Sequence, residues 1–343
     1  MPVMDGRAAG AVATAAQALQ AGDLVAIPTE TVYGLAADAG NDAAVAKIFA
    51  AKGRPSEHPL IVHVDDTGMG ADGAAFFAQA IPSAAQALMQ AFWPGPLTLI
   101  LPRRAAVGRA AAGGQDSIGL RCPSHPVAQA LLHACRQRGV MGLAAPSANQ
   151  FGRVSPTTAA HVQGEFGSAL LVLDGGACDV GIESTIVDCT RREPVLLRPG
   201  AITPGQLEQA CGQRVRLAQD AEQDAPAPRA PGTLLAHYAP KARVRLMGAA
   251  ALQTALDMLG GDVKPSSTGP VIATYARAVL RSRSSGVLSR RMPDDAASTA
   301  RQLFAVLRDF DDQGVRLIWV EEPPDDDAWD GVRDRLQRAS AAG

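Results

Sequence analysis

Short apolar runs alternate with stretches of helical periodicity through about the first two hundred residues, and turns rich in Gly and Pro separate them. Runs of this length between turn residues predict buried strands. The predicted strands cover residues 24–27, 60–64, 97–101, 118–120, 140–144, 170–173, 185–188 and 195–197. Helices are predicted over 12–19, over 43–52 with Gly53 as the stop signal, and from the Ser155-Pro156 cap onward. The pattern indicates a mixed α/β domain with seven or more strands.

The pattern changes after residue 212. Residues 219–231 carry Pro, Ala and Asp without hydrophobic periodicity, which is typical of an extended linker. Beyond it, strands are predicted over 244–247, 271–274 and 317–320, and helices over 249–259, 295–310 and 328–336. This alternation predicts a small parallel sheet of the doubly wound type. With 343 residues, the chain is long enough for two domains. We therefore expect a domain over 1–212, a linker or lid over 213–241 and a smaller domain over 242–343.

Composition narrows the functional classes. The net charge is −2, which argues against a protein built mainly to grip nucleic acid. The five cysteines form no CxxC pair and no zinc-like pattern, so reduced thiols in a cytoplasmic protein are expected. No apolar stretch approaches the roughly 20 residues of a membrane span, and the N-terminus has no export signal of ordinary build. We expect no contact with a membrane.

Two short phrases carry candidate chemistry. Lys52 and Arg54 stand two residues apart before one predicted strand, and Ser147 and Asn149 stand two residues apart after another. In extended backbone, each pair points to one side. Two cations, a hydroxyl and an amide suit a polyanion that carries a polar base, such as a nucleoside triphosphate. The alternative is that Lys52 and Arg54 only offset the dipole at a helix C-terminus. Spacing alone slightly favours this alternative.

A GxGxxG pattern occurs at Gly68, Gly70 and Gly73, but the chain contains no GxxxxGK[ST] phosphate loop. Asp65 and Asp66 precede the pattern and would repel a pyrophosphate, so a surface loop is the favoured interpretation.

Other polar positions are ambiguous by themselves. The stretch 181–185 suits either an anion-binding loop or a turn. Arg121 and Arg198 follow predicted strands beside Pro, which suits the rim of a cleft or a surface ion pair. His63 lies inside an apolar run and is more typical of a satisfied core histidine.

Taken together, these phrases resemble the threonylcarbamoyl-AMP synthase family in its long, two-domain form. The matching stretches are 28–35 (PTETVYGL), 52–55 (KGRP), 59–63 (PLIVH), 93–98 (WPGPLT), 119–123 (GLRCP), 145–149 (APSAN), 181–185 (GIEST), 197–200 (LRPG) and 236–241 (AHYAPK). The resemblance implies a YrdC-like domain, with a twisted mixed sheet and flanking helices, followed by a small Rossmann-like parallel α/β domain.

In this family, L-threonine, bicarbonate and ATP form threonylcarbamoyl-adenylate and pyrophosphate, which makes the enzyme a nucleotidyltransferase. The product supplies the threonylcarbamoyladenosine modification of tRNA, which a separate transferase completes. The resemblance places Thr31, His63, Arg121, Ala145 and Ser184 at threonine, with Arg121 as the partner of the carboxylate. It places Lys52, Arg54, His58, Ser117, Ser147, Asn149, Ser155, Arg198 and Tyr238 at ATP, with Lys52 and Arg54 as the catalytic residues. His58 and Ser117 depart from the family pattern, which has asparagine and threonine there.

The reaction needs no protein nucleophile, so positioning and charge stabilisation carry it. We expect Mg²⁺ to arrive with ATP rather than at a protein metal site. Direct binding to tRNA is expected to be weak or absent. Two alternatives are an RNA-binding or ribosome-assembly factor with a YrdC-like domain, and a maturation protein that uses carbamoyl phosphate. The acidic net charge disfavours the first, and the lack of CxxC disfavours the second.

Overall fold

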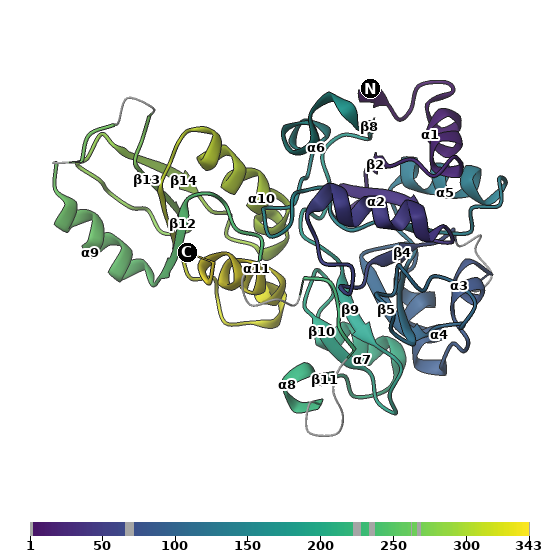
Figure 1. Cartoon of the computed structure of the whole chain (residues 1–343). Coiled ribbons are helices and arrows are strands. Elements are labelled where there is room, and N and C mark those ends of the chain that lie inside the picture. The colour runs from purple at the N-terminus through teal and green to yellow at the C-terminus, as the bar shows by residue number, and fades with distance from the viewer. Residues whose placement is uncertain are drawn as a thin grey trace. The chain divides into compact units, whose positions relative to one another are not determined.

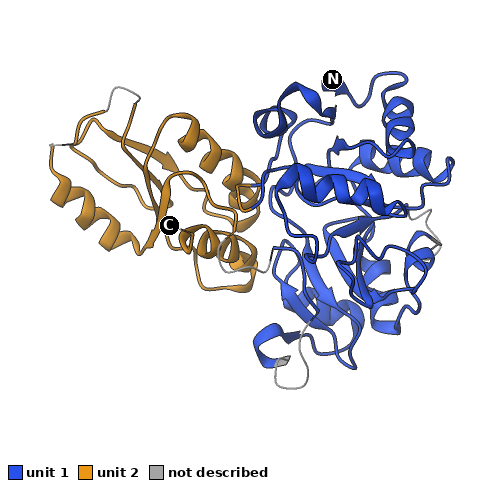
Figure 2. Ribbon diagram, in the orientation of Figure 1, with its two compact units in different colours: residues 1–151, 155–233 blue, residues 152–154, 234–343 orange. Residues whose placement is uncertain are grey.

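The computed structural model divides the chain into two compact units (Figure 2). The first comprises residues 1–151 and 155–233, and the second comprises residues 152–154 and 234–343. The structure describes residues 3–65, 72–221, 228–232, 237–261, 263–265 and 269–342. The division falls inside the predicted linker, whose borders stay a prediction.

The first unit is built on one mixed sheet flanked by helices (Figure 1). Its strands are β1 (Val3–Asp5), β2 (Val25–Ile27), β3 (Gly34–Asp38), β4 (Ile61–His63), β5 (Leu97–Pro102), β6 (Ser117–Arg121), β7 (Leu143–Ala144), β8 (Leu171–Asp174), β9 (Thr185–Asp188), β10 (Val195–Arg198) and β11 (Arg216–Leu217). Its helices are α1 (Ala11–Gln20), α2 (Asp42–Lys52), α3 (Asp72–Phe77), α4 (Ser83–Phe92), α5 (Pro126–Arg136), α6 (Ala159–Phe166), η1 (Gly167–Ala169), α7 (Pro204–Cys211) and α8 (Ala218–Ala221).

Across the described residues the strand order is β1-β8-β2-β3-β7-β4-β6-β5-β9-β10-β11. Strand β6 pairs in parallel with β4 and antiparallel with β5, and β5 pairs in parallel with β9. The predicted mixed sheet is therefore confirmed. This order brings together strands that are far apart in the sequence, because β4, β6, β5 and β9 are neighbours.

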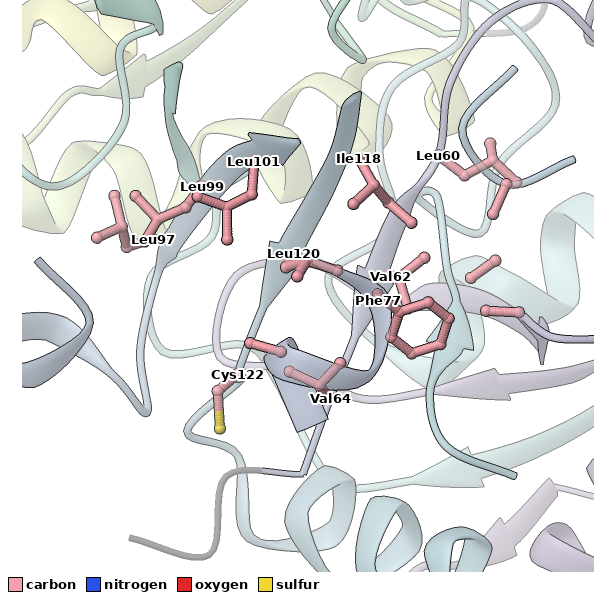
Figure 3. Close-up of a cluster of buried hydrophobic side chains, with 14 of the residues drawn as sticks. Leu60, Val62, Val64, Phe77, Leu97, Leu99, Leu101, Ile118, Leu120 and Cys122 are labelled. Carbon is pink, nitrogen blue, oxygen red and sulfur yellow. The ribbon is translucent and has the colours of Figure 1, made fainter. Parts of the chain in front are cut away.

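The two faces of the central strands differ in the side chains that they carry. Val62, Ile118, Leu120 and Leu99 belong to one large buried cluster, which Figure 3 shows as side chains of β4, β5 and β6 packed around Phe77. Because side chains alternate along a strand, the intervening residues point to the opposite face. Helices α1 and α5 pack over β2, β8 and β7 in a separate cluster. A smaller cluster that includes Ile61, Ile100 and Ile186 lies on the central strands.

The opposite face of β4, β6 and β5 also carries the polar side chains. Counting alternate positions puts His63 on this face of β4, Ser117 and Arg121 on β6, and Thr98 on β5. Gly119 lies between Ser117 and Arg121, and a Cβ placed there would approach Thr98 Cγ2 at 3.5 Å. We call this surface, from β7 to β10, the polar face. The absence of a side chain at Gly119 leaves room in its middle.

The second unit is a small α/β fold. Its elements are β12 (Arg243–Met247), α9 (Ala249–Leu259), β13 (Ile272–Ala276), β14 (Val287–Arg291), α10 (Ala296–Asp312), β15 (Leu317–Glu321), η2 (Asp327–Trp329) and α11 (Asp330–Ser340). The strand order is β12-β15-β13-β14, and every pair is parallel. The predicted parallel sheet is confirmed, and β14 is a strand that the sequence pattern did not reveal.

Two local predictions in the first unit were wrong. The run 140–144 forms a strand only at Leu143–Ala144, because Val140 N–H bonds back to the Cys135 carbonyl at the end of α5. Ser155 does not cap a helix. Thr158 caps α6, with its side chain accepting from the His161 N–H, and the Ser155 hydroxyl binds the Glu183 carboxylate instead.

The described cysteines form no disulfide, and four of the five are buried. None of the described helices combines the length and the apolar character that a bilayer crossing requires.

Candidate active site

Lys52 is placed by the end of a helix. It is the last residue of α2, and Gly53 follows in the left-handed conformation, at φ 62°, and caps the helix. The backbone at this point is therefore helical and then reversed, so the extended geometry predicted for Lys52 and Arg54 is wrong. The Lys52 Nζ atom donates to the Ser147 carbonyl at 2.6 Å and also to the Asn149 carbonyl. The two phrases that stood out in the sequence do meet, but through backbone acceptors.

Burial changes the acidity of this lysine. Its side chain is only 2% exposed, and burial lowers its pKa from 10.5 to about 7, with the nearby Arg54 acting in the same direction and Glu165 opposing it. An amine with such a pKa can exist in both forms near neutral pH. A bound polyanion would favour the charged form.

Arg54 lies close to Lys52 in the sequence and contacts Pro59 and Phe151. Its Nη2 atom donates to the Pro59 carbonyl at 2.9 Å, and its guanidinium lies 5.8 Å from the centre of the Phe151 ring. His58 meets the same ring edge-on at 5.8 Å, and burial, followed by Arg54, lowers the pKa of His58. The Phe151 N–H bonds to the Lys52 carbonyl at 3.0 Å. We call Lys52, Arg54, His58, Ser147 and Asn149 the lysine cluster.

A second group forms around Arg121, at the end of β6. Its Nη1 atom donates to Thr31 Oγ1 at 2.7 Å, its Nε atom donates to the Gly95 carbonyl at 3.2 Å, and its Nη2 atom lies 2.6 Å from Glu30 Oε1. His63 is the register partner of Arg121 on the neighbouring strand β4. We call Glu30, Thr31, His63 and Arg121 the arginine cluster.

His63 is held neutral in this cluster. Burial, together with the positive charge of Arg121, lowers the pKa of its imidazole to about 3. A neutral imidazole offers one donor and one acceptor. Its Nδ1 atom has no hydrogen-bond partner among the described residues, and its expected contact with threonine stays a prediction.

A third group of polar side chains comprises Ser184, which directly precedes β9, Arg198 at the end of β10, and Thr98 on β5. The Ser184 and Thr98 hydroxyls are 2.7 Å apart, and Arg198 Nη2 donates to Ser184 Oγ at 3.1 Å. The Nε atom of Arg198 also donates to the Ser184 carbonyl at 3.0 Å, and its Nη1 atom donates to the Pro231 carbonyl at 2.9 Å. A residue expected at threonine and a residue expected at ATP are thus in direct contact.

Several of the predicted residues lie around β4, β6 and β7. The register of β4, β6 and β7 puts the lysine cluster near the start of β4 and the arginine cluster near its end. Ser117 begins β6, and Ala145 N–H bonds to the Ile61 carbonyl at 2.9 Å, between the two clusters. Ser155 joins the same region through Glu183, the neighbour of Ser184.

Tyr238 belongs to the second unit. It is almost fully buried, its ring centre lies 5.6 Å from that of Phe304, and the Arg335 guanidinium lies 5.3 Å from its ring. Its expected contact with ATP stays a prediction. The GxGxxG glycines Gly68 and Gly70 lie outside the described residues, and Gly73 lies within α3.

Sequence reasoning missed three residues of this site. Glu30 contacts Arg121, Thr98 contacts Ser184, and Gly119 leaves the middle of the polar face open. The alternation of Ser117, Gly119 and Arg121 was readable as one face of a strand. The contact of Glu30 was not readable, because 91 positions separate it from its partner.

Across the described residues, no group of three or more His, Cys, Asp or Glu side chains is close enough to hold a metal ion.

The fold and this site define a YrdC-like domain with an attached C-terminal domain, and the chain belongs to the Sua5/YciO/YrdC family. The model of that family, described as telomere recombination, matches residues 17–200, and the model of the threonylcarbamoyl-AMP synthase C-terminal domain matches residues 202–341.

Similar proteins cover nearly the whole chain. The threonylcarbamoyl-AMP synthase of Pyrococcus abyssi is 36% identical over 95% of this chain and 93% of its own length. That of Bacillus subtilis is also 36% identical, over 96% of this chain and 92% of its own length. The crystal structure of P. abyssi Sua5 in complex with L-threonine superposes with a TM-score of 0.84, at 34% identity, over 96% of this chain and 94% of that one. The predicted family, fold class and enzyme class are confirmed.

Proposed function

We propose that this protein is an L-threonylcarbamoyladenylate synthase. It joins L-threonine, bicarbonate and ATP into threonylcarbamoyl-AMP and releases pyrophosphate. Its relatives at 36% identity over nearly the full chain carry the name threonylcarbamoyl-AMP synthase, which supports the assignment. The adenylate then supplies a separate transferase that modifies tRNA, and we expect no tight binding of tRNA by this protein itself.

The observation that carries the proposal is the presence of two buried cationic clusters near the opposite ends of β4, one around Arg121 and one around Lys52 and Arg54. Arg121 is 3% exposed and suits the carboxylate of an amino acid, because a guanidinium matches a carboxylate with two parallel donors. Lys52 and Arg54, at the other end of β4, suit a triphosphate. Arg198 is a further buried cation, and its guanidinium binds the Ser184 carbonyl and hydroxyl.

The chemistry follows from this arrangement. The amine of threonine, in its neutral form, attacks the carbon of bicarbonate, and water leaves as the N-carboxylate forms. With CO₂ instead, one C=O π bond opens and the nitrogen loses a proton. One oxygen of this carboxylate then attacks the α-phosphorus of ATP, and the bond from that phosphorus to the pyrophosphate breaks. Arg121, Thr31 and neutral His63 orient the amino acid, while Lys52, Arg54 and Arg198 offset the charge of the phosphates. Mg²⁺ bound to ATP supplies further charge neutralisation on the phosphate oxygens.

The experiment is a product assay. The purified protein is incubated with ATP, Mg²⁺, bicarbonate and L-threonine, and threonylcarbamoyl-AMP is detected by mass spectrometry alongside pyrophosphate release. Each substrate is omitted in turn, and L-serine replaces threonine in a parallel reaction. We expect the adenylate only in the complete mixture. Pyrophosphate release that is independent of threonine and bicarbonate would contradict the proposal.

A further inference from the structure

Unsatisfied polar atoms gather around Arg121. Glu30 is 5% exposed and His63 is 3% exposed, yet Glu30 Oε2 and His63 Nδ1 have no hydrogen-bond partner among the described residues. Buried polar atoms in native proteins are nearly always paired, because an unpaired one has lost its hydrogen bonds to water without replacement. Two such atoms beside one buried cation indicate a place where a polar ligand completes the bonding.

The ion pair between Arg121 and Glu30 leaves hydrogen-bonding groups of both side chains unused. Arg121 Nη2 and Glu30 Oε1 are 2.6 Å apart, but neither atom makes an aligned hydrogen bond to a described residue. Arginine has five N–H groups, and those of Nε and one on Nη1 are used by Gly95 and Thr31. Terminal N–H groups of the guanidinium therefore remain for a ligand carboxylate. The free oxygen of Glu30 lies beside them and offers an acceptor for a cation.

From this geometry we propose that Glu30 binds the α-ammonium group of the amino-acid substrate through Oε2, while Arg121 binds its carboxylate. The inference rests on the proposed function and adds a residue to it. A buried carboxylate and a buried guanidinium in contact have no net charge, and the zwitterion of an amino acid has none either. Together they form a neutral group of four alternating charges, which avoids burying an uncompensated charge.

This pairing makes Glu30 a determinant of specificity. A ligand with a carboxylate but no ammonium would leave Glu30 Oε2 unpaired and would add a second anion beside it. A ligand with an ammonium but no carboxylate would leave the terminal N–H groups of Arg121 unpaired. Both analogues should bind more weakly than threonine itself, each for a different reason.

The test compares three ligands on four proteins by isothermal titration calorimetry. The ligands are L-threonine, L-threoninol, which lacks the carboxylate, and (R)-3-hydroxybutanoate, which lacks the ammonium. The proteins are the wild type, Glu30→Gln, Arg121→Lys and Asp188→Asn. Glutamine keeps an oxygen for Arg121 but loses the charge. Asp188 is a matched control, because it is fully buried and pairs with Arg191 at 2.9 Å in the same unit.

We expect Glu30→Gln to weaken L-threonine and L-threoninol by about tenfold or more and to leave (R)-3-hydroxybutanoate unchanged or tighter. Arg121→Lys should weaken L-threonine and (R)-3-hydroxybutanoate but not L-threoninol. Asp188→Asn should change none of them. If Glu30→Gln weakens all three ligands equally, or weakens none, the assignment of the ammonium to Glu30 is overturned.

The wild type alone provides a second measurement, which remains informative if Glu30→Gln does not fold. Wild-type protein that binds (R)-3-hydroxybutanoate as tightly as L-threonine would overturn the role of Glu30. Wild-type protein that binds no L-threonine, with or without ATP, would overturn the proposed function instead. The two failures are therefore distinguishable.

Discussion

Binding of ATP should be linked to protonation of Lys52. The lysine is fully buried, and its pKa falls from 10.5 to about 7 in the protein without nucleotide. At about 1.4 kcal/mol per pKa unit, this lowering means that the free protein disfavours the charged form of Lys52 by about 5 kcal/mol relative to water. A triphosphate beside Lys52 restores the charged form, so the pKa rises on binding. At pH 8 about nine-tenths of the free protein has a neutral Lys52, and ATP binding should take up about 0.9 proton.

The assay is isothermal titration calorimetry of ATP at pH 8 in buffers of different ionisation enthalpy. The slope of the binding enthalpy against that ionisation enthalpy gives the number of protons taken up. Lys52→Arg is the test variant, because arginine stays charged in both states and should take up close to none. Lys47→Arg is the matched control on the same helix, since Lys47 has a side chain that is 51% exposed and should leave the proton uptake at the wild-type value.

The sign of the pH dependence is fixed by the lowered pKa. Below pH 7 Lys52 is already charged and ATP binding carries no protonation cost from it. Above pH 7 the affinity should fall, by up to about tenfold for each pH unit, until the pH reaches the pKa of the complex. If wild type and Lys52→Arg take up the same number of protons at pH 8, Lys52 does not change its charge on binding, and its role at the phosphates is refuted.

Three further substitutions separate the site from the fold. Gly119→Val should keep the melting temperature within a few degrees, because a Cβ meets Thr98 only at an ordinary 3.5 Å, but it should lower kcat/KM by about tenfold or more by filling the polar face. Gly142→Ala should cost about 1–3 kcal/mol of unfolding free energy, because its Cβ would lie 2.6 Å from Phe77, while the KM values for both substrates stay unchanged. Arg198→Lys should raise the KM for ATP by about tenfold, because lysine cannot replace its paired bonds to the Ser184 carbonyl. Steady-state kinetics and thermal melts check all three. A Gly142→Ala protein with altered KM values would contradict the second prediction. A Gly119→Val or Arg198→Lys protein with wild-type kinetics would contradict the first or the third.

Much of the fold could be predicted because local signals were strong. The run 185–188 forms β9 with the predicted bounds, and α2 ends at Lys52 because Gly53 adopts the left-handed conformation that glycine tolerates. In the second unit α9 also matches its predicted range. These elements have clear apolar periods and clear stop residues.

Other elements had weaker or misleading signals. Strand β3 is a Gly-Leu-Ala-Ala-Asp stretch, and alanine is a poor marker of strands. Strand β14 ends in Ser and two Arg at the edge of its sheet, so it has little apolar content to reveal it. Val140 reads as part of a strand, but its N–H closes the end of α5.

The site residues were found by motif, but their geometry was not. The sequence predicted that Lys52, Ser147 and Asn149 serve the same ligand. In the structure Lys52 binds the backbone carbonyl groups of Ser147 and Asn149, and because every residue has such a group, the side chains did not predict this contact. Glu30 stood in a matching stretch without a role, because its pairing with Arg121 arises only when the start of the chain folds beside β6. Contacts between distant segments depend on the strand order, which no local pattern contains.

The central claim is that one face of the first unit's sheet holds both substrates, with the amino acid at Arg121 and the triphosphate at Lys52 and Arg54. A crystal structure of the protein with L-threonine and a non-hydrolysable ATP analogue tests it most directly. We expect the threonine carboxylate within hydrogen-bond distance of the Arg121 guanidinium, and phosphate oxygens within the same distance of Lys52 and Arg54. A nucleotide bound away from the polar face, with Lys52 still donating only to the Ser147 and Asn149 carbonyls, would contradict the account.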